Sequence, residues 1–376
     1  MDLSIVVKPT LSCNIGCRHC YHADERTDGV ISEGTLEKVI RLASSGYETV
    51  RFIWHGGEPL TLPLKFYKKA ISLQERYFGK DSHRVSNTVQ TNGTLIDKRF
   101  MNFCREKKIN VGVSFEGPCN DMMRKMTETV QKNLDMMKKE GHMFSVSSTV
   151  CRNAVTKMEM MYDHFVGNGM ALSLSPVIRL GSATPDTVPD ADEYADASIR
   201  TFNKWLYDVN AETPLMPHLL YVASALGEQS PSDCAHSSCA MKWMCVYPNG
   251  DIYPCAKGCP SRFRLCNIDD VERLSDAFRK DAMGEFLTQT IERRERCMAE
   301  CELFRYCNGG CSVDALSEGS MSSNGGNSCK IFKKVFSHIL NTTETILRDR
   351  PDLSRYNKFV REAIIGKLVD PKVTNV

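Results

Sequence analysis

Three closely spaced cysteines near the start of the chain constrain its chemistry more than any other feature. Cys13, Cys17 and Cys20 form a C-x3-C-x2-C run that begins soon after the apolar segment 3–7. Three thiolates on one short loop can ligate three irons of a four-iron cluster, and no fourth cysteine follows nearby. The incomplete set leaves one iron open for chemistry, whereas structural metal sites fill every position. A zinc loop or chance clustering is the alternative interpretation.

The composition limits the class of protein. The chain has 376 residues, enough for a barrel-sized domain with a smaller one beside it. Its 48 Lys and Arg residues balance 46 Asp and Glu residues, so we expect no nucleic-acid partner and no membrane-surface partner. No apolar run approaches the roughly 20 residues that span a bilayer. Strand-like residues begin too early for a signal peptide, and we therefore predict a cytoplasmic protein.

The number of cysteines points to metal binding. A chain in a reducing compartment that carries 17 cysteines at short spacings is more suited to ligating metals than to forming disulfides. Eleven of them fall in short-spaced runs, and we predict core packing for the scattered remainder. The scattered residues are Cys104, Cys119, Cys151, Cys245, Cys259 and Cys266.

The first half of the sequence alternates strand and helix signals. Ser32 is the predicted N-cap of a helix that ends at Ala43, because apolar residues recur there at helical spacing. The predicted strands are 3–7, 50–54, 85–89, 111–114, 144–150 and 171–175, and the other predicted helices are 64–77, 98–107, 130–140 and 158–168. Six repeated β/α units predict a parallel sheet with helices outside and a site at the carboxyl ends of the strands.

The cysteine run resembles the signature of the radical S-adenosylmethionine (SAM) superfamily. The resemblance implies an α/β fold with a partial (β/α)6 barrel, and a [4Fe-4S] cluster held by the first three cysteines. It also implies that SAM binds the open iron through its amino and carboxylate groups. One electron from the cluster then cleaves SAM into methionine and a 5′-deoxyadenosyl radical, which abstracts hydrogen from the substrate.

Residues that follow the predicted strands match the SAM site of that superfamily. Gly56 and Gly57 permit close backbone approach, and the resemblance assigns the next residue, Glu58, to the SAM amino group. It places Tyr21 beside the adenine and Ser114 at the ribose. The other candidate SAM contacts are Asn92, Glu116 (where relatives often have Asp) and Arg124, which either binds a carboxylate or lies on the solvated surface.

The second half carries a further set of cysteines around a predicted β-hairpin. The hairpin spans 246–255, with Asn249-Gly250 as its turn. The region resembles the SPASM extension of radical SAM enzymes, which implies two auxiliary [4Fe-4S] clusters and so three clusters in total. Four thiolates also suit zinc. The resemblance assigns Cys234, Cys239, Cys255 and Cys311 to one cluster, and Cys297, Cys301, Cys307 and Cys329 to the other. Cys245, Cys259 and Cys266 are possible substitutes.

These patterns divide the chain into four predicted parts. Residues 1–181 form the radical SAM partial barrel, and 182–233 form a helical bridging region with helices at 194–209 and 218–227. Residues 234–330 form the small cysteine-rich SPASM domain with its β-hairpin. Residues 331–376 form a C-terminal helical segment, in which apolar residues from Ile331 to Leu340 recur at helical spacing.

The resemblance leaves the reaction open between two kinds of peptide oxidation. The favoured hypothesis is an enzyme that matures a ribosomally made peptide by forming a thioether or carbon–carbon cross-link. The alternative is an anaerobic sulfatase-maturating enzyme, which oxidises a Cys or Ser of its protein substrate to formylglycine. In that family an aspartate after the hairpin cysteine serves as the base, but here Cys255 is followed by Ala256 and Lys257. Neither residue suits a base at neutral pH, which disfavours the alternative.

A different class of function is electron transfer alone by a multi-cluster protein. The incomplete cysteine triad and the Gly-Gly-Glu sequence argue against it, because a carrier needs no open iron. Both enzymatic hypotheses predict a peptide or protein substrate and an external electron donor such as flavodoxin or ferredoxin.

Overall fold

The computed structural model describes residues 2–23, 28–227, 234–236, 239–257, 261–323 and 325–369. All six predicted β/α strands are present in the first half of the chain. They are β1 (Asp2–Thr10), β2 (Thr49–Gly56), β3 (Val85–Thr91), β4 (Asn110–Ser114), β5 (Ser145–Val150) and β6 (Ala171–Pro176). The helices between them are α1 (Glu33–Ala43), α2 (Leu64–Phe78), α3 (Lys98–Glu106), α4 (Thr127–Lys139) and α5 (Met158–Val166).

Local sequence accounts for where these helices begin. The Ser32 side chain accepts a hydrogen bond from the Thr35 backbone N–H and so caps α1 as predicted. Asp97 caps α3 in the same way through the Phe100 N–H. Helix α4 begins at Thr127, one turn before the predicted start, after Met126 adopts a left-handed conformation. These caps satisfy backbone donors that have no partner within the helix.

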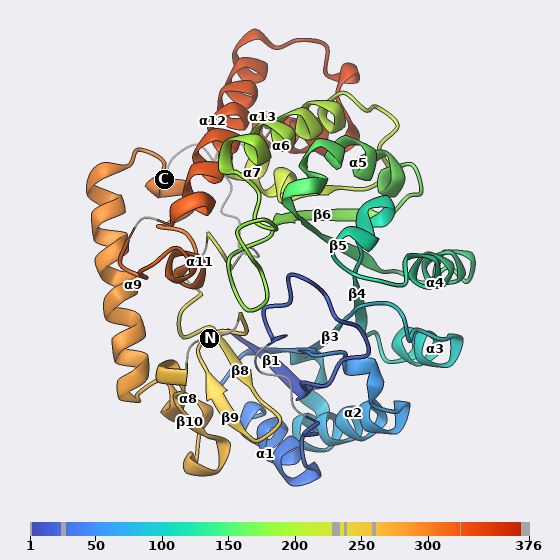
Figure 1. The fold of residues 1–376 in the computed structure, drawn as a ribbon, viewed down its shortest axis with the longest axis vertical. Helices are drawn as coiled ribbons and strands as arrows, with labels where there is room; N and C mark the ends of the chain where they lie inside the picture. Colours follow the sequence, from blue (N-terminus) through green and yellow to red (C-terminus); the bar gives the residue numbers. More distant parts are fainter. Residues whose placement is uncertain are drawn as a thin grey trace.

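The strands form one sheet that continues beyond the six β/α units. Its order is β10-β9-β8-β1-β2-β3-β4-β5-β6-β7, and every pairing from β8 to β7 is parallel. The added strands are β7 (Leu215–Met216), β8 (Trp243–Val246), β9 (Asp251–Tyr253) and β10 (Cys266–Asn267). Helices α1 to α5 lie along the outer side of the curved sheet (Figure 1). The predicted partial barrel is confirmed.

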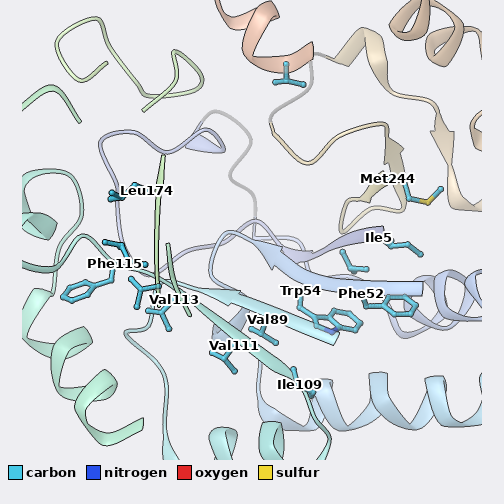
Figure 2. Close-up of a cluster of buried hydrophobic side chains, with 14 of the residues drawn as sticks. Ile5, Phe52, Trp54, Val89, Ile109, Val111, Val113, Phe115, Leu174 and Met244 are labelled. Atoms are coloured by element: carbon cyan, nitrogen blue, oxygen red, sulfur yellow. The ribbon is translucent and has the colours of Figure 1, made fainter. Parts of the chain in front are cut away.

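The predicted hairpin is also present, but it belongs to the barrel sheet. Strands β8 and β9 pair antiparallel on either side of the Asn249-Gly250 turn. Strand β8 then lies parallel to β1, with Ile5 opposite Met244. Both side chains are buried in the hydrophobic core drawn in Figure 2. The cysteine-rich region is therefore joined to the barrel through a continuous sheet and core.

The second half is mostly helical. The two helices predicted for the bridging region are α6 (Ala191–Leu206) and α7 (His218–Ala225), although residues 228–233 of that region lie outside the described part of the chain. The predicted C-terminal helix is α12 (Gly326–Asp349), which packs on α6 and α7. The further helices are α8 (Leu274–Ala277), α9 (Asp281–Glu300), α10 (Phe304–Cys307), α11 (Ser312–Ser317) and α13 (Lys358–Val369).

Helix α9 was not predicted from the sequence. It is a 20-residue helix, and only Met283, Phe286, Thr290 and Arg293 of it are buried. So narrow an apolar stripe gives a weak helical signal. Helix α9 runs along one side of the molecule, beside α11 and away from α3 and α4 (Figure 1).

Among the described residues, no helix combines the length and the apolar character that crossing a membrane requires.

We predict that Met244→Ala destabilises the barrel. Met244 lies on hairpin strand β8, opposite Ile5 of β1, and only 1% of the residue is exposed. A buried Met→Ala change costs about 2–5 kcal/mol, from lost apolar burial and the cavity left behind. The measurement is urea unfolding of the apo-protein followed by circular dichroism. Met143→Ala is the matched control, since Met143 is 90% exposed. Equal free energies of unfolding for the two variants would contradict the shared core.

Candidate active site and cysteine groups

The loop that carries the cysteine triad is fastened to the end of β2 by backbone contacts. The Gly57 N–H donates to the Thr10 carbonyl at 3.0 Å, and the Glu58 N–H donates to the Ser12 carbonyl at 2.9 Å. A Cβ atom on Gly57 would lie 2.1 Å from the Ser12 oxygen, so only glycine fits here. The Gly-Gly-Glu sequence thus fixes the start of the cysteine loop.

Glu58 is buried, and its carboxylate is occupied within the protein. It accepts hydrogen bonds from the Leu60 N–H at 2.9 Å, the Thr91 hydroxyl at 2.6 Å and the Asn92 N–H at 2.7 Å. Burial raises the pKa of Glu58, while these three hydrogen bonds lower it. The carboxylate therefore joins the ends of β2 and β3, and it does not line the cavity described below.

Asn92 holds the cysteine loop from the end of β3. Its Nδ2 donates to Asn14 Oδ1 at 2.9 Å and lies 3.9 Å from Cys13 Sγ. Its Oδ1 accepts from the backbone and hydroxyl of Thr94. These bonds fix the amide orientation, so Asn92 presents an N–H donor beside the first cysteine.

Arg124 is buried against the second cysteine, so the surface alternative is wrong. Its side chain is 13% exposed and forms an ion pair with Glu116, with Nε at 2.8 Å from Oε2 and 3.0 Å from Oε1. Its Nη1 lies 3.4 Å from Cys17 Sγ. Glu116 also accepts from the Thr149 N–H at 3.1 Å. Glu116 positions Arg124, and Arg124 places a positive charge beside a triad thiol.

A strap from the end of the barrel closes the loop from the other side. The Ser182 N–H donates to the Cys20 carbonyl at 3.0 Å, and a Cβ atom on Gly181 would lie 2.3 Å from that same oxygen. Gly181 has a φ of +54°, which also favours glycine. The triad is thus held by segments from β2, β3 and the chain after β6.

One cavity of about 960 Å3 lies over the carboxyl ends of the strands. It is lined by the triad and by six of the candidate SAM contacts, namely Tyr21, Gly56, Gly57, Asn92, Ser114 and Arg124. Glu58 and Glu116 are absent from its lining and act on residues that are present. The rest of the floor carries hydroxyl groups from the final strands: Ser147, Thr149, Ser173 and Ser175.

His55 and His19 also line the cavity, and neither was predicted from the sequence. His55 precedes the Gly-Gly pair, and its Nδ1 accepts from the Gly56 N–H at 2.7 Å while Nε2 lies 3.4 Å from the Tyr21 hydroxyl. Burial lowers the pKa of His55 to about 3, helped by the charges of His22 and Lys8. His19 lies in the triad loop, and burial and Arg124 lower its pKa to about 3. Both imidazoles are neutral at physiological pH.

Lys8 is a third residue that was not predicted from the sequence. It is fully buried on β1, and its Nζ donates to the Tyr247 hydroxyl at 2.6 Å and to His22 Nδ1 at 3.4 Å. A signal was present, because Lys8 directly follows the apolar residues Ile5, Val6 and Val7 within the strand, where a buried charge is costly. It links the hairpin to the segment after the triad.

The assignment of the eight later cysteines to two groups of four stays a prediction of the resemblance, and the electrostatic neighbours of several of these thiols bear on it. Burial raises the pKa of Cys307, and the neighbouring thiolates of Cys301, Cys329 and Cys297 raise it further. In the other group, burial and the Cys255 thiolate raise the pKa of Cys239 to about 11. Burial and Cys255 also raise the pKa of Cys311, and Lys257 lies beside Cys311, Cys234 and Cys255.

The donor sets fit the clusters that the sequence predicted. Each later group offers four thiols, while the first loop offers only three. Among the described residues, no three His, Cys, Asp or Glu side chains meet as closely as the ligands of a single metal ion. A four-iron cluster takes each thiolate on a different iron, so its ligands need not meet at one point. All candidate ligands except Cys239 and Cys255 line the cavity.

Most of the scattered cysteines are packed in the core as predicted. Cys104, Cys119, Cys151 and Cys266 belong to the main hydrophobic cluster, and Cys245 is buried with Val6, Leu11 and Tyr247 in a smaller one. Cys259, a possible substitute ligand, lies outside the described residues.

The segment after the hairpin cysteine places a cation in the cavity wall. Lys257 Nζ lies 3.0 Å from Asp314 Oδ1, and both residues line the cavity. Ala256 packs against the smaller hydrophobic cluster and does not line the cavity. The structure thus supplies no carboxylate at the position where the resemblance implied a base.

A partial parallel barrel whose first strand leads into an open three-cysteine loop defines an enzyme that cleaves SAM by radical chemistry. The family model described as Radical SAM superfamily matches residues 7–157. The chain therefore carries a radical SAM domain over these residues, and enzymes of that superfamily use a [4Fe-4S] cluster and SAM. The zinc interpretation of the first loop is therefore set aside.

Several relatives match nearly the whole chain. A serine-type anaerobic sulfatase-maturating enzyme of Klebsiella aerogenes is 26% identical over 380 residues, covering 96% of this chain and 90% of the relative. A cysteine-type anaerobic sulfatase-maturating enzyme of Clostridium perfringens is 26% identical over 367 residues, covering 89% and 96%. The solved structure of native anSMEcpe with bound AdoMet has a TM-score of 0.80 at 24% identity, covering 92% of this chain and 100% of that one. This likeness confirms the predicted fold class.

We predict that Gly57→Ala displaces the triad loop, because the added Cβ meets two backbone oxygens of residues 11 and 12 at 2.5 and 2.1 Å. A misplacement of this order lowers catalysis by roughly 100-fold. The measurement is 5′-deoxyadenosine formed from SAM by the reconstituted, reduced enzyme. Gly16→Ala is the control on the same loop, where nothing lies within 4 Å of the added atom. Equal loss in both variants would contradict this account.

We predict that Arg124→Met destabilises the protein by about 3–5 kcal/mol, because it leaves the Glu116 carboxylate buried without its partner. Replacing both residues with methionine should cost less, since no charge is then stranded. Urea unfolding of the apo-protein measures both variants. Lys98→Met is the control at an exposed ion pair with Glu140, where about 1 kcal/mol or less is expected. A double variant less stable than the single one would argue against the pair.

Proposed function

We propose that this radical SAM enzyme oxidises a cysteine or serine side chain of a protein substrate to formylglycine. The names of the relatives that match nearly the whole chain support this reaction. They favour it over the cross-linking reaction that the sequence hypothesis preferred. A neighbouring structure is described as anSMEcpe with bound AdoMet and Cp18Cys peptide, with a TM-score of 0.80 and 24% identity. A peptide segment is accordingly the proposed substrate here.

The single cavity is the observation that carries the proposal. It brings the triad, six of the eight candidate SAM contacts and members of both later cysteine groups into one space of about 960 Å3. A substrate side chain bound in this space would share it with the residues that would hold SAM and with the later cysteine groups. Hydrogen abstraction and electron removal can then act on one bound residue, as a two-electron oxidation requires.

The proposed cofactors are SAM and three [4Fe-4S] clusters. When bound, they supply a hydrogen-abstracting radical at the triad and electron acceptors at the two later groups. The chain's own residues position them: Asn92 and Arg124 lie against triad thiols, and Gly57 holds the loop. Tyr21, Gly56 and Ser114 are the remaining proposed SAM contacts on the cavity wall. Glu58 and Glu116 are proposed to act indirectly, through Asn92 and Arg124.

The substitution at position 256 bears on which residue is oxidised. Formylglycine formation removes a proton from the substrate thiol or hydroxyl, and the chain has Ala256 where the resemblance implied a base. A thiol has a pKa of about 8.5 and ionises without strong help, whereas a serine hydroxyl does not. We therefore propose cysteine as the preferred substrate residue. The proposed electron donor is an external flavodoxin or ferredoxin.

The second candidate function is the formation of a thioether or carbon–carbon cross-link in a ribosomally made peptide. The residue at position 256 favours it, because the chain has Ala256 where the resemblance assigns an aspartate to sulfatase maturation.

Anaerobic incubation of the reconstituted enzyme with SAM, dithionite and a sulfatase active-site peptide tests the proposal. We expect 5′-deoxyadenosine together with a peptide aldehyde, trapped by a hydrazide probe, and faster reaction of the cysteine peptide than of its serine analogue. Cys17→Ala should abolish both products, because the triad is broken.

Loss of a hydrogen pair from a cysteine-rich peptide, with no aldehyde, would favour the second candidate. Reduced enzyme that leaves SAM intact would contradict both.

A further inference from the structure

Arg293 is a fully buried arginine on α9, with 0% of the residue exposed. Its Nε donates to the Gly309 carbonyl at 2.9 Å, and Nη1 donates to the Met321 carbonyl at 2.6 Å. Its Nη2 donates to the Gly310 carbonyl at 3.1 Å and to the Ser312 hydroxyl at 3.0 Å. Every one of these acceptors is neutral.

Within the described ranges, no ion pair joins the positive charge of Arg293 to a carboxylate, whereas Arg124 and Lys257 each have one. Arginine does not shed its proton in proteins. A buried charge is costly unless an opposite charge lies near it. The compensation has to come from something other than Asp or Glu.

Arg293 lies beside the backbone that carries cysteines of both later groups, because its acceptors Gly309, Gly310 and Ser312 are within two residues of Cys307 or Cys311. Burial lowers the pKa of Arg293, and the Cys311, Cys297 and Cys239 thiolates raise it. Cys311 and Cys239 belong to one proposed cluster, while Cys297 belongs to the other. Arg293 thus acts on both groups from a position shared between them.

The triad has a different electrostatic environment. Arg124 lies against Cys17, but Glu116 neutralises it at 2.8 Å. An arginine paired with a carboxylate changes the local electrostatic potential less than an arginine without one, because the fields of the two charges largely cancel. The chain therefore places a neutralised cation at the first cluster and an unneutralised one between the other two.

We propose that Arg293 is the shared countercharge of the two auxiliary clusters and raises the reduction potential of both. The proposal rests on the cluster assignment in the proposed function. Net charge near a cluster is one of the factors that set its potential. Reduction adds one electron and one negative charge to a cluster, with no bond made or broken, and a fixed cation stabilises that reduced state. Both clusters are thereby suited to accept the electron that the substrate loses.

A purely structural role makes a different prediction. The guanidinium also ties the carbonyls of Gly309 and Gly310 to that of Met321, so it braces the loop that ends at Cys311. Loss of this brace lowers stability and iron content but leaves the potential of any cluster that does assemble unchanged. Potential and iron content together separate the two roles.

The test is a redox titration of the anaerobically reconstituted, full-length enzyme, followed by electron paramagnetic resonance. Arg293→Gln removes the charge, Arg293→Lys keeps it, and Ser312→Asp leaves Arg293 in place but adds a carboxylate where its Nη2 now meets a hydroxyl. Arg296→Gln is the matched control, because it removes an exposed arginine from the same helix. Iron content and apo-protein stability are measured for each variant.

We expect Arg293→Gln and Ser312→Asp to lower the ratio of reduced to oxidised auxiliary clusters at least tenfold at a fixed potential. For a one-electron couple this is a shift of about 59 mV. Arg293→Lys and Arg296→Gln should remain close to wild type. Wild-type potentials in Arg293→Gln with normal iron, or a shift in Arg293→Lys as large as in Arg293→Gln, would overturn the proposal.

If Arg293→Gln fails to assemble its clusters, the reduction potentials of Ser312→Asp provide the test. Unchanged potentials in that variant overturn the proposal. Because these titrations need no peptide, a negative result leaves the formylglycine assay unaffected, and failure of that assay leaves the potentials measurable.

Discussion

The close approach of two backbones, at the end of β1 and the end of β2, determines where the chemistry of this enzyme takes place. Gly57 lies so near Ser12 that no side chain fits between them, and two N–H donors tie residues 57 and 58 to residues 10 and 12. Because β1 and β2 are neighbouring parallel strands, this contact fixes the cysteine loop over the carboxyl end of the sheet. The cavity, the triad and the proposed SAM contacts all take their positions from it.

Buried charge is distributed unevenly around this site. Glu58 satisfies its carboxylate with backbone and hydroxyl donors, and Glu116 satisfies its own with Arg124. Arg293 instead donates to carbonyl oxygens and to the Ser312 hydroxyl. Carboxylates near the triad hold other residues in place, whereas Arg293 lies where anionic clusters are proposed. The triad and the later cysteines therefore lie in different electrostatic environments within one chain.

The joined sheet explains how one cavity can serve three cysteine groups. Strand β8 pairs with β1, so the hairpin that leads to Cys255 continues the barrel rather than hanging from a linker. Lys8 bonds Tyr247 across the same junction. Groups that are more than 200 residues apart in the sequence are thereby fixed relative to one another, which electron removal from a single bound residue requires.

The six β/α units and the hairpin turn could be predicted from the sequence, because local periodicity and turn chemistry need no knowledge of distant contacts. The open triad followed from the spacing of three cysteines, whereas the assignment of the eight later cysteines to two groups came from the family resemblance and stays a prediction. The sequence also favoured cross-linking over sulfatase maturation from one substitution, Ala256, a preference that the full-length relatives do not support.

The direction of individual side chains depends on the folded structure and could not be predicted from the sequence. Arg124 pairs with the Glu116 carboxylate, and Glu58 does not line the cavity. Arg293 lies beside the later cysteines on α9, a helix that the sequence pattern did not predict. Each of these placements depends on partners far along the chain, and local sequence carries no record of which distant groups will meet.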